Sequence, residues 1–492
     1  MIGAGPGGLA TALLLAGKGY RVKVVEKQGY VGGRTSSFNQ DGFVFDRGPT
    51  FFSMPHLLED IFAEVGRNLS DYLTLKEVDP LYKLQFNDVS FAPNRNEQQT
   101  YNEIERLFPG NGEGYLRFMK ETREKMNALM PLLQNKHDSL LDYTRLRALK
   151  ALPSLSLGKT LYDELSKYFT DERLKLSFTF QSKYLGMSPW ECPGAFSILS
   201  FMEHEYGIFH PVGGVNQITK ALATAFQELG GEIELNRAVK KIVVKNGRAQ
   251  GLAYEDGEQE ETDELVINAD FAHAMSNLVD DQHLKKYKTP KLENKKYSCS
   301  TFMIYANVEK VYNEHHHTVV FSEDYKKNVE EITGSKTLSA DPSIYIHNPI
   351  VTDDTLAPKG KSPLYLLAPV PNNFSQLDWE EHKETFVELI FDQIERKSTF
   401  KDLRNHISSY SVVTPTDWQH QFNVYKGATF NLAHNLGQMM YFRPHNKFEE
   451  LKNCWLTGGG THPGSGLPTI LASATITANG IFKADKKGIL IK

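Results

Sequence analysis

The chain has 492 residues, of which 40% are hydrophobic and 23% are charged, as is typical of a packed globular protein of two or three domains. Its formal net charge of -5 leaves no broad basic surface, so we expect no nucleic-acid partner. The 3 cysteines form no C-x-x-C pair and no apolar run reaches about 18 residues, so we expect a cytoplasmic protein without a local zinc site, redox dithiol or membrane-spanning helix.

The first predicted elements surround a glycine-rich turn. The motif GAGPGG runs from Gly3 to Gly8, an apolar helix pattern continues to Gly17, and a strand pattern covers 20–27. This is the order of a dinucleotide-binding β-α-β unit. In such a unit Gly3 permits a tight turn, Gly5 lets the backbone approach a pyrophosphate, and Gly8 lets helix and strand pack closely.

An acidic residue and an arginine follow the strand pattern. Glu26 stands where a carboxylate can accept both ribose hydroxyls of an adenosine. The stretch VGGR then places Arg34 where a guanidinium meets a phosphate with a planar fork of donors.

The middle of the chain alternates helical and strand-like segments. Residues 75–205 are predicted to be largely helical, with apolar helix spacing over 115–134 and 196–209. A helix is then predicted from about 216 to 229, a strand around 232–235 and a hairpin turned at Asn246-Gly247. Beyond it, strand patterns at 299–308 and 362–370 and a helix over 382–397 are predicted.

A second glycine-rich signature lies near the other end of the chain. TGGGTHPGSGLPT follows a predicted short strand over 454–457 and leads into a helix of small residues. Glycines and a helix N-terminus offer backbone N–H groups to an anion or to another hydrogen-bond acceptor. Glycine-rich turns that can bind an anion therefore lie near both ends of the chain.

These motifs, in this order, resemble the FAD-binding signatures of the phytoene desaturase family, within the larger amine oxidase-like group of flavoproteins. The resemblance covers most of the chain and is closest to the bacterial dehydrosqualene (4,4'-diapophytoene) desaturases. It implies an α/β fold in which a Rossmann-like FAD-binding domain is assembled from 1–75, 206–290 and 441–492. An α+β substrate-binding region, with helices that dock on a membrane, would then comprise 76–205 and 291–440.

The resemblance also implies further contacts with FAD, among them Lys27, Gly33, Gly48 and Pro49. Ala238 and Val239 would give backbone contacts to the adenine, and Asn268-Ala269-Asp270 would end a strand near the cofactor. In the terminal loop the implied contacts with the pyrophosphate and the flavin ring are Gly458, Gly459, Thr461, Gly466 and Pro468. Only Met1 and Ile2 precede Gly3, so we expect either an unusually short central strand or a few residues missing from the sequence.

The implied reaction is the repeated dehydrogenation of an apolar C30 carotenoid precursor by hydride transfer to FAD, with oxygen or a quinone as the final electron acceptor. A sister group oxidises the terminal methyl groups of such carotenoids. His462 favours the desaturase, because asparagine tends to replace this histidine in the oxidases, and it is the one candidate catalytic residue. Amine oxidases and non-catalytic FAD-binding escort proteins share the FAD signatures and stay open as alternatives.

Two other stretches bear on partners. The run His315-His316-His317 suggests a metal, but we favour a solvated polar loop and predict no metal site. An apolar polyene dissolves in membranes, so we expect a peripheral membrane protein. Residues 145–159 carry four basic residues, no acid and five leucines, and are the predicted docking segment; the alternative is a helix end packed on the core.

Overall fold

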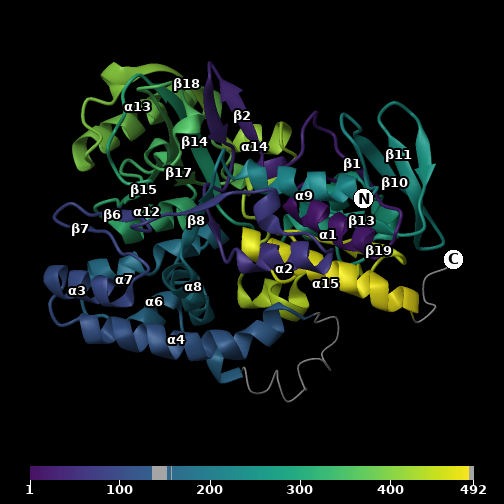
Figure 1. Cartoon of the computed structure of the whole chain (residues 1–492), viewed down its shortest axis with the longest axis horizontal. Helices are drawn as coiled ribbons and strands as arrows, with labels where there is room; N and C mark the ends of the chain where they lie inside the picture. The colour runs from purple at the N-terminus through teal and green to yellow at the C-terminus, as the bar shows by residue number, and fades with distance from the viewer. Residues whose placement is uncertain (136–151, 157, 487–492) are drawn as a thin grey trace.

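A parallel sheet assembled from distant parts of the chain lies on one side of the molecule (Figure 1). The computed structural model describes residues 1–135, 152–156 and 158–486. The strands of this sheet are β9 (Glu232–Glu234), β1 (Lys23–Val25), β13 (Leu265–Ile267) and β19 (Cys454–Leu456). Ile2 lies between β1 and β13 and joins the two pairs, since its N–H donates to the Val266 carbonyl at 2.9 Å. The central strand of the sheet is therefore very short.

Three helices pack beside this sheet. They are α1 (Pro6–Gly17), α9 (Asn216–Glu228) and α15 (Leu467–Lys486), and α1 contacts both of the others (Figure 1). The first ten residues of α1 are all buried, which explains why its sequence is apolar on every side rather than on one stripe. The predicted helices at both ends and in the middle of the chain are confirmed. The hairpin of β10 (Val239–Lys245) and β11 (Arg248–Tyr254) turns at Asn246-Gly247, as predicted.

A seven-stranded sheet forms the second half of the molecule. Its order is β18 (Ile407–Val413), β14 (Ser300–Val308), β17 (Ser362–Val370), β16 (Ile344–His347), β15 (His317–Val320), β6 (Lys83–Gln85) and β7 (Ser90–Phe91). The two long central strands β14 and β17 are buried along nearly their whole length, as their continuous apolar sequences predict. Side chains of α13 (Trp379–Lys397) share one apolar core with these strands.

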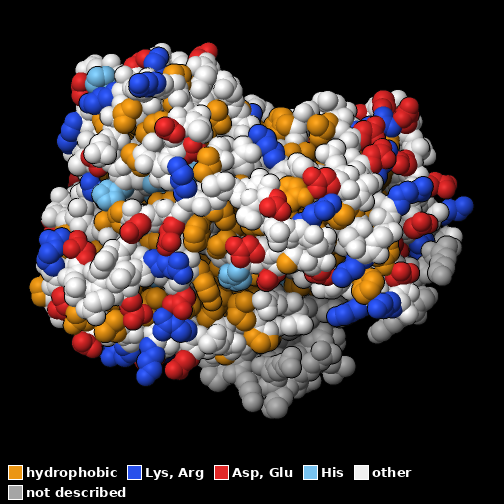
Figure 2. Space-filling view, viewed as in Figure 1, with side chains coloured by type: hydrophobic (Ala, Val, Ile, Leu, Met, Phe, Trp, Pro, Cys, Tyr) orange, Lys and Arg blue, Asp and Glu red, His pale blue; other side chains and the backbone are white. Residues whose placement is uncertain are grey.

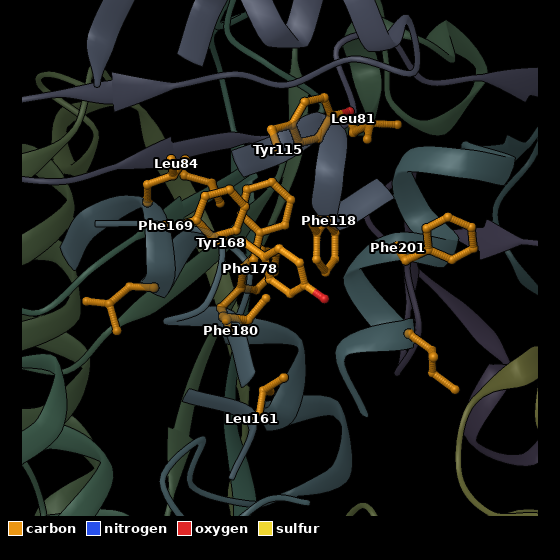
Figure 3. Packing of buried hydrophobic residues seen from close by; sticks show 14 of the residues in the cluster. Leu81, Leu84, Tyr115, Phe118, Leu161, Tyr168, Phe169, Phe178, Phe180 and Phe201 are labelled. Carbon is orange, nitrogen blue, oxygen red and sulfur yellow. The ribbon is translucent and has the colours of Figure 1, made fainter. Parts of the chain in front are cut away.

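A helical layer lies next to the seven-stranded sheet (Figure 1). It contains α3 (Glu97–Leu107), α4 (Gly112–Leu133), α6 (Leu161–Leu165), α7 (Glu172–Ser177) and α8 (Ile198–Tyr206). Figure 3 shows aromatic side chains meeting at its centre, and the rings of Phe169 and Phe178 stack with centroids 4.8 Å apart. Such pairs each stabilise by about 0.5–1.5 kcal/mol beyond the area that they bury. The cluster also holds Phe180, at the start of the 3-10 helix η5 (Phe180–Leu185).

A small antiparallel sheet lies between these parts. It consists of β4 (Phe52–Ser53), β8 (Ile208–Pro211) and β5 (Leu75–Glu77), with β8 in the middle. A separate hairpin of β2 (Ser37–Gln40) and β3 (Phe43–Asp46) packs on β17. The division into a cofactor domain and a substrate-binding region stays a proposal.

The histidine run is not a solvated loop, contrary to our interpretation of the sequence. His316 and His317 are 4% and 2% exposed, and only His315 of the three is partly exposed. The physical reason is that His317 begins β15, which is an interior strand between β16 and β6. A polar sequence is thus enclosed by the sheet that it joins.

The predicted membrane-docking segment lies mostly outside the described residues. Of 145–159, the structure describes only 152–156 and 158–159. Within the described ranges, no helix combines the length and the apolar character needed to cross a membrane.

Candidate active site

A cavity of about 1010 Å³ is lined by residues from both halves of the molecule. One part of its lining comes from the glycine turn before α1, the ends of β1 and β13, and the terminal glycine loop. The other part comes from η5, α8, β14, β16 and β17, and its side chains include Phe180, Leu199, Met202, Met303 and Leu367. On the surface, hydrophobic side chains gather between α8 and α2 (His56–Glu64) (Figure 2). We call the first part of this lining the polar end of the cavity and the second part its apolar end.

Most of the predicted cofactor residues meet at the polar end. The lining includes Gly3, Gly5, Glu26, Lys27, Gly33, Arg34, Gly48, Pro49, Val239, Gly458, Gly459, Gly466 and Pro468. Ala238 and Asn268-Ala269-Asp270 also line it. Gly8, Thr461 and His462 are not among the lining residues. The fold thus brings segments from the beginning, middle and end of the chain to one surface.

The glycines at this end allow close backbone approaches. Gly3 has a φ of +93°, and a Cβ there would lie 2.2 Å from the Asn268 carbonyl oxygen. A Cβ on Gly8 would lie 2.3 Å from the Gly3 oxygen, so this glycine serves the packing of helix against turn. A Cβ on Gly7 would lie 3.2 Å from Cα of Gly458, so the first and last glycine motifs are in contact. A side chain at any of these three positions would therefore crowd neighbouring backbone atoms.

The N-terminus of α1 faces this end of the cavity. Pro6 occupies the first helical position, where the lack of an N–H costs little. The N–H of Leu9 donates to the Gly5 carbonyl at 3.0 Å, whereas the N–H groups of Gly7 and Gly8 have no acceptor among the described residues. Unpaired N–H groups at a helix N-terminus, together with the helix dipole, attract an anion such as a pyrophosphate.

Glu26 is held in place by the backbone at the end of β1. Its two carboxylate oxygens accept the N–H groups of Ala4 and Gln28, both at 2.9 Å, and the residue is only 8% exposed. A carboxylate oxygen can accept more than one hydrogen bond, so each oxygen of Glu26 can also accept a ribose hydroxyl. The neighbouring Lys27 donates from Nζ to the Gln421 carbonyl at 3.0 Å, and burial lowers its pKa.

Arg34 lies in a buried group of polar side chains. Its Nη1 donates to the Thr429 carbonyl at 2.6 Å. The amide of Asn431, in the orientation that satisfies both neighbours, donates to Asp270 and accepts from Arg34. Burial lowers the pKa of Arg34 and raises that of Asp270, and the attraction between the two opposes both changes. The guanidinium is therefore fixed on one side and can offer its other donors to a phosphate.

The structure does not bring Thr461 and His462 to the cavity. Both are buried, at 2% and 5% exposed, on the protein side of the terminal glycine loop. The Thr461 hydroxyl donates to the Pro444 carbonyl at 2.5 Å, and His462 Nε2 shares a hydrogen bond of 3.1 Å with the Asn135 carbonyl. These contacts hold the loop in place on the side that faces away from the cavity.

Arg443 is a supporting residue that the sequence analysis missed. It is fully buried, and its guanidinium donates to the carbonyls of Gly459 and Thr461 at 2.7 and 3.1 Å. Burial lowers the pKa of Arg443 to about 9. An isolated arginine outside any motif carries no signal in a single sequence, because its role depends on the loop that folds over it.

Two ionisable side chains line the apolar end. The Lys183 ammonium lies 4.5 Å from the centre of the Tyr325 ring, and burial lowers the pKa of Lys183 to about 7. Glu203 is 4% exposed and accepts a hydrogen bond from Gln181 Nε2 at 2.8 Å. Neither residue belongs to a recognisable motif, so the sequence analysis missed both.

Comparisons with known proteins agree with this arrangement. Residues 6–481 match the family model of the flavin containing amine oxidoreductases. A 4,4'-diapophytoene desaturase (4,4'-diapolycopene-forming) of Methylomonas sp. is 45% identical over 478 residues, covering 97% of this chain and 94% of that protein. A zeta-carotene-forming phytoene desaturase of Myxococcus xanthus is 36% identical over 486 residues, covering 98% and 93%.

Among solved structures, an oxidoreductase from Methanosarcina mazei has a TM-score of 0.64 at 17% sequence identity. The alignment covers 98% of this chain and 99% of that one. This likeness shows a shared fold over the whole chain.

Proposed function

Since this chain belongs to the flavin containing amine oxidoreductase family, we propose that it is a carotenoid desaturase whose substrate is a C30 polyene such as 4,4'-diapophytoene. It is an FAD-dependent oxidoreductase. The observation that carries the proposal is 45% identity to a 4,4'-diapophytoene desaturase along nearly the whole chain. The cavity supports it, because its two ends suit a dinucleotide and an apolar chain.

The residues at the polar end fit FAD. We propose that the N-terminus of α1 and Arg34 bind the pyrophosphate, that Glu26 accepts the ribose hydroxyls, and that Val239 lies by the adenine. The terminal loop residues Gly458, Gly459, Gly466 and Pro468 would then hold the flavin end. When bound, FAD supplies the acceptor for the hydride that leaves the substrate carbon.

The apolar end positions the polyene and excludes water. Side chains such as Leu199, Met202 and Leu367 gain free energy from contact with a hydrocarbon but offer it no hydrogen bonds. Forming each double bond releases a hydride from one carbon and a proton from its neighbour. We propose that Nζ of Lys183, whose pKa of about 7 leaves much of it neutral, accepts this proton.

We further propose that the enzyme docks peripherally on the cytoplasmic side of a membrane and passes its electrons to oxygen or a quinone. The support is chemical, since a C30 hydrocarbon partitions into the bilayer. A basic, leucine-containing segment such as 145–159 binds anionic lipid surfaces.

The test is to add FAD-loaded protein to liposomes that contain 4,4'-diapophytoene, with a quinone or with oxygen. We expect absorbance to move to longer wavelengths as conjugated double bonds accumulate, and each product to lack two more hydrogens by mass spectrometry. Oxygenated ends, formed only from an already desaturated substrate, would identify a terminal oxidase. A parallel reaction with C40 phytoene compares the chain lengths, and faster turnover of phytoene would contradict the C30 assignment.

A further inference from the structure

Three buried histidines lie together away from the cavity. His210 comes from β8, His316 directly precedes β15, and His347 ends β16. They are 0%, 4% and 2% exposed, and none of them lines the large cavity described above. Each offers a ring nitrogen within 4.8 Å of a nitrogen of the other two. The proposed reaction makes no use of this cluster.

The two closest nitrogens belong to His316 and His347. Their Nε2 atoms are 3.1 Å apart. Two nitrogen ligands of a tetrahedral Zn²⁺, each about 2.0–2.1 Å from the ion, lie a little more than 3 Å from each other. The separation therefore suits a shared ion, and the ligand nitrogen of His210 lies within 4.8 Å of those of both other histidines.

Neighbouring groups orient the rings as metal sites require. His210 Nε2 lies 2.9 Å from the carboxylate of Asp353, and His316 Nδ1 lies 2.6 Å from the Thr352 hydroxyl. A carboxylate that accepts from one ring nitrogen fixes the proton there and leaves the other nitrogen free to bind a metal. In His210 that other nitrogen, Nδ1, is buried and has no hydrogen-bond partner among the described residues.

Burial and hydrogen bonding shift the pKa values of several groups in this cluster. Burial, together with the neighbouring histidines, lowers the pKa of His316 and His347 well below the usual value. Burial raises the pKa of Asp353, but hydrogen bonds from His210, Gly213 and Thr355 outweigh this and hold it below its usual range.

We propose that His210, His316 and His347 bind one Zn²⁺ ion, with the Asp353 carboxylate orienting the His210 ring. Imidazole nitrogens are ligands that zinc favours, and the fourth position would take a water molecule. The ion would tie β8 of the small sheet to β15 and β16 of the seven-stranded sheet. β15 and β16, which carry residues of the apolar end of the cavity, would thereby be fixed to β8, the strand that precedes α9.

The histidine run itself provides a matched control. His315 is adjacent to His316 but is partly exposed and is not a member of the cluster. The full-length protein and its variants are produced with added Zn²⁺, desalted, and analysed for bound zinc by mass spectrometry. We expect about one zinc per chain in the wild type and in His315→Gln. His316→Gln and His347→Gln should lose it, and His316→Cys should regain it because a thiolate also binds zinc.

Loss of flavin absorbance after desalting identifies variants that fail to fold. X-ray absorption at the zinc edge of the wild-type protein then identifies the atoms that bind the zinc, without the use of any variant. Imidazole nitrogens at about 2.0–2.1 Å from the metal would support the site, and an all-oxygen or sulfur shell would overturn it. Wild-type zinc no higher than in His316→Gln, or equal losses in His316→Gln and His315→Gln, would also overturn it.

Discussion

Replacing Gly5 by valine should remove flavin from the protein while leaving it folded. Gly5 is the N-cap of α1 with φ -76° and ψ 173°, an extended conformation that valine adopts readily. A Cβ there would lie 2.9 Å from Nδ2 of Asn268, so this amide, which donates to the Gly3 carbonyl at 3.2 Å, would have to shift by a few tenths of an ångström. We therefore expect a loss in unfolding free energy of only about 1 kcal/mol.

The effect on cofactor binding should be much larger. The valine methyl groups would stand at the cavity surface in front of the unpaired N–H groups of Gly7 and Gly8. A hydrogen bond to a charged group contributes about 1.5–3 kcal/mol, so losing two costs about 3–6 kcal/mol. At about 1.4 kcal/mol for each tenfold change, the Kd for FAD should rise roughly 10²–10⁴-fold.

The assay is a titration of flavin-free protein with FAD, followed by fluorescence, with the Tm of the flavin-free forms measured in parallel. Gly437→Val is the control, because Gly437 is exposed, lies outside the cavity lining and has only Asn435 Oδ1 near its Cβ position, at 3.7 Å. An unchanged Kd in Gly5→Val would refute the pyrophosphate assignment. A large fall in Tm of flavin-free Gly5→Val would instead mean that Gly5 is needed for packing.

Three other changes have distinct expected outcomes. Gly8→Ala should destabilise the protein by about 1–3 kcal/mol in urea unfolding, because its Cβ would lie 2.3 Å from a backbone oxygen; an unchanged midpoint would contradict this. Because Lys183 binds its proton more weakly in the folded protein, the unfolding free energy should rise from pH 7 to 10.5, and Lys183→Met should flatten that rise; parallel pH profiles would show that Lys183 is not buried as described. The turnover rate of Lys183→Met should also no longer depend on the titration of a group with a pKa of about 7. Reversing the charges in Arg145→Glu, Arg147→Glu and Lys150→Glu removes about 1 kcal/mol of lipid attraction per residue and should abolish flotation with anionic liposomes at low salt; equal flotation of variant and wild type would place the docking surface elsewhere.

Local patterns in the sequence were enough to identify the elements of the cofactor site. The glycine turn, the apolar α1, the hairpin at Asn246-Gly247 and the short strand β19 are all confirmed, since each depends on neighbours within a few residues. The strand predicted over 20–27 is shorter, because β1 pairs with β9 over only three residues, Lys23–Val25. The resemblance to known flavoproteins supplied the expectation that separate segments share one cofactor.

Only the tertiary structure decided where individual side chains point. His462 lies in a recognisable motif, yet its ring turns toward Asn135 rather than into the cavity. Arg443 and Lys183 became notable through burial by segments distant in the sequence, which no local spacing encodes. The histidine run has the polar composition of a loop, but pairing of β15 between two strands encloses it and brings His316 to His347. Local sequence therefore determined which elements form, whereas the free energy of packing those elements together determined which polar groups are buried and what they meet.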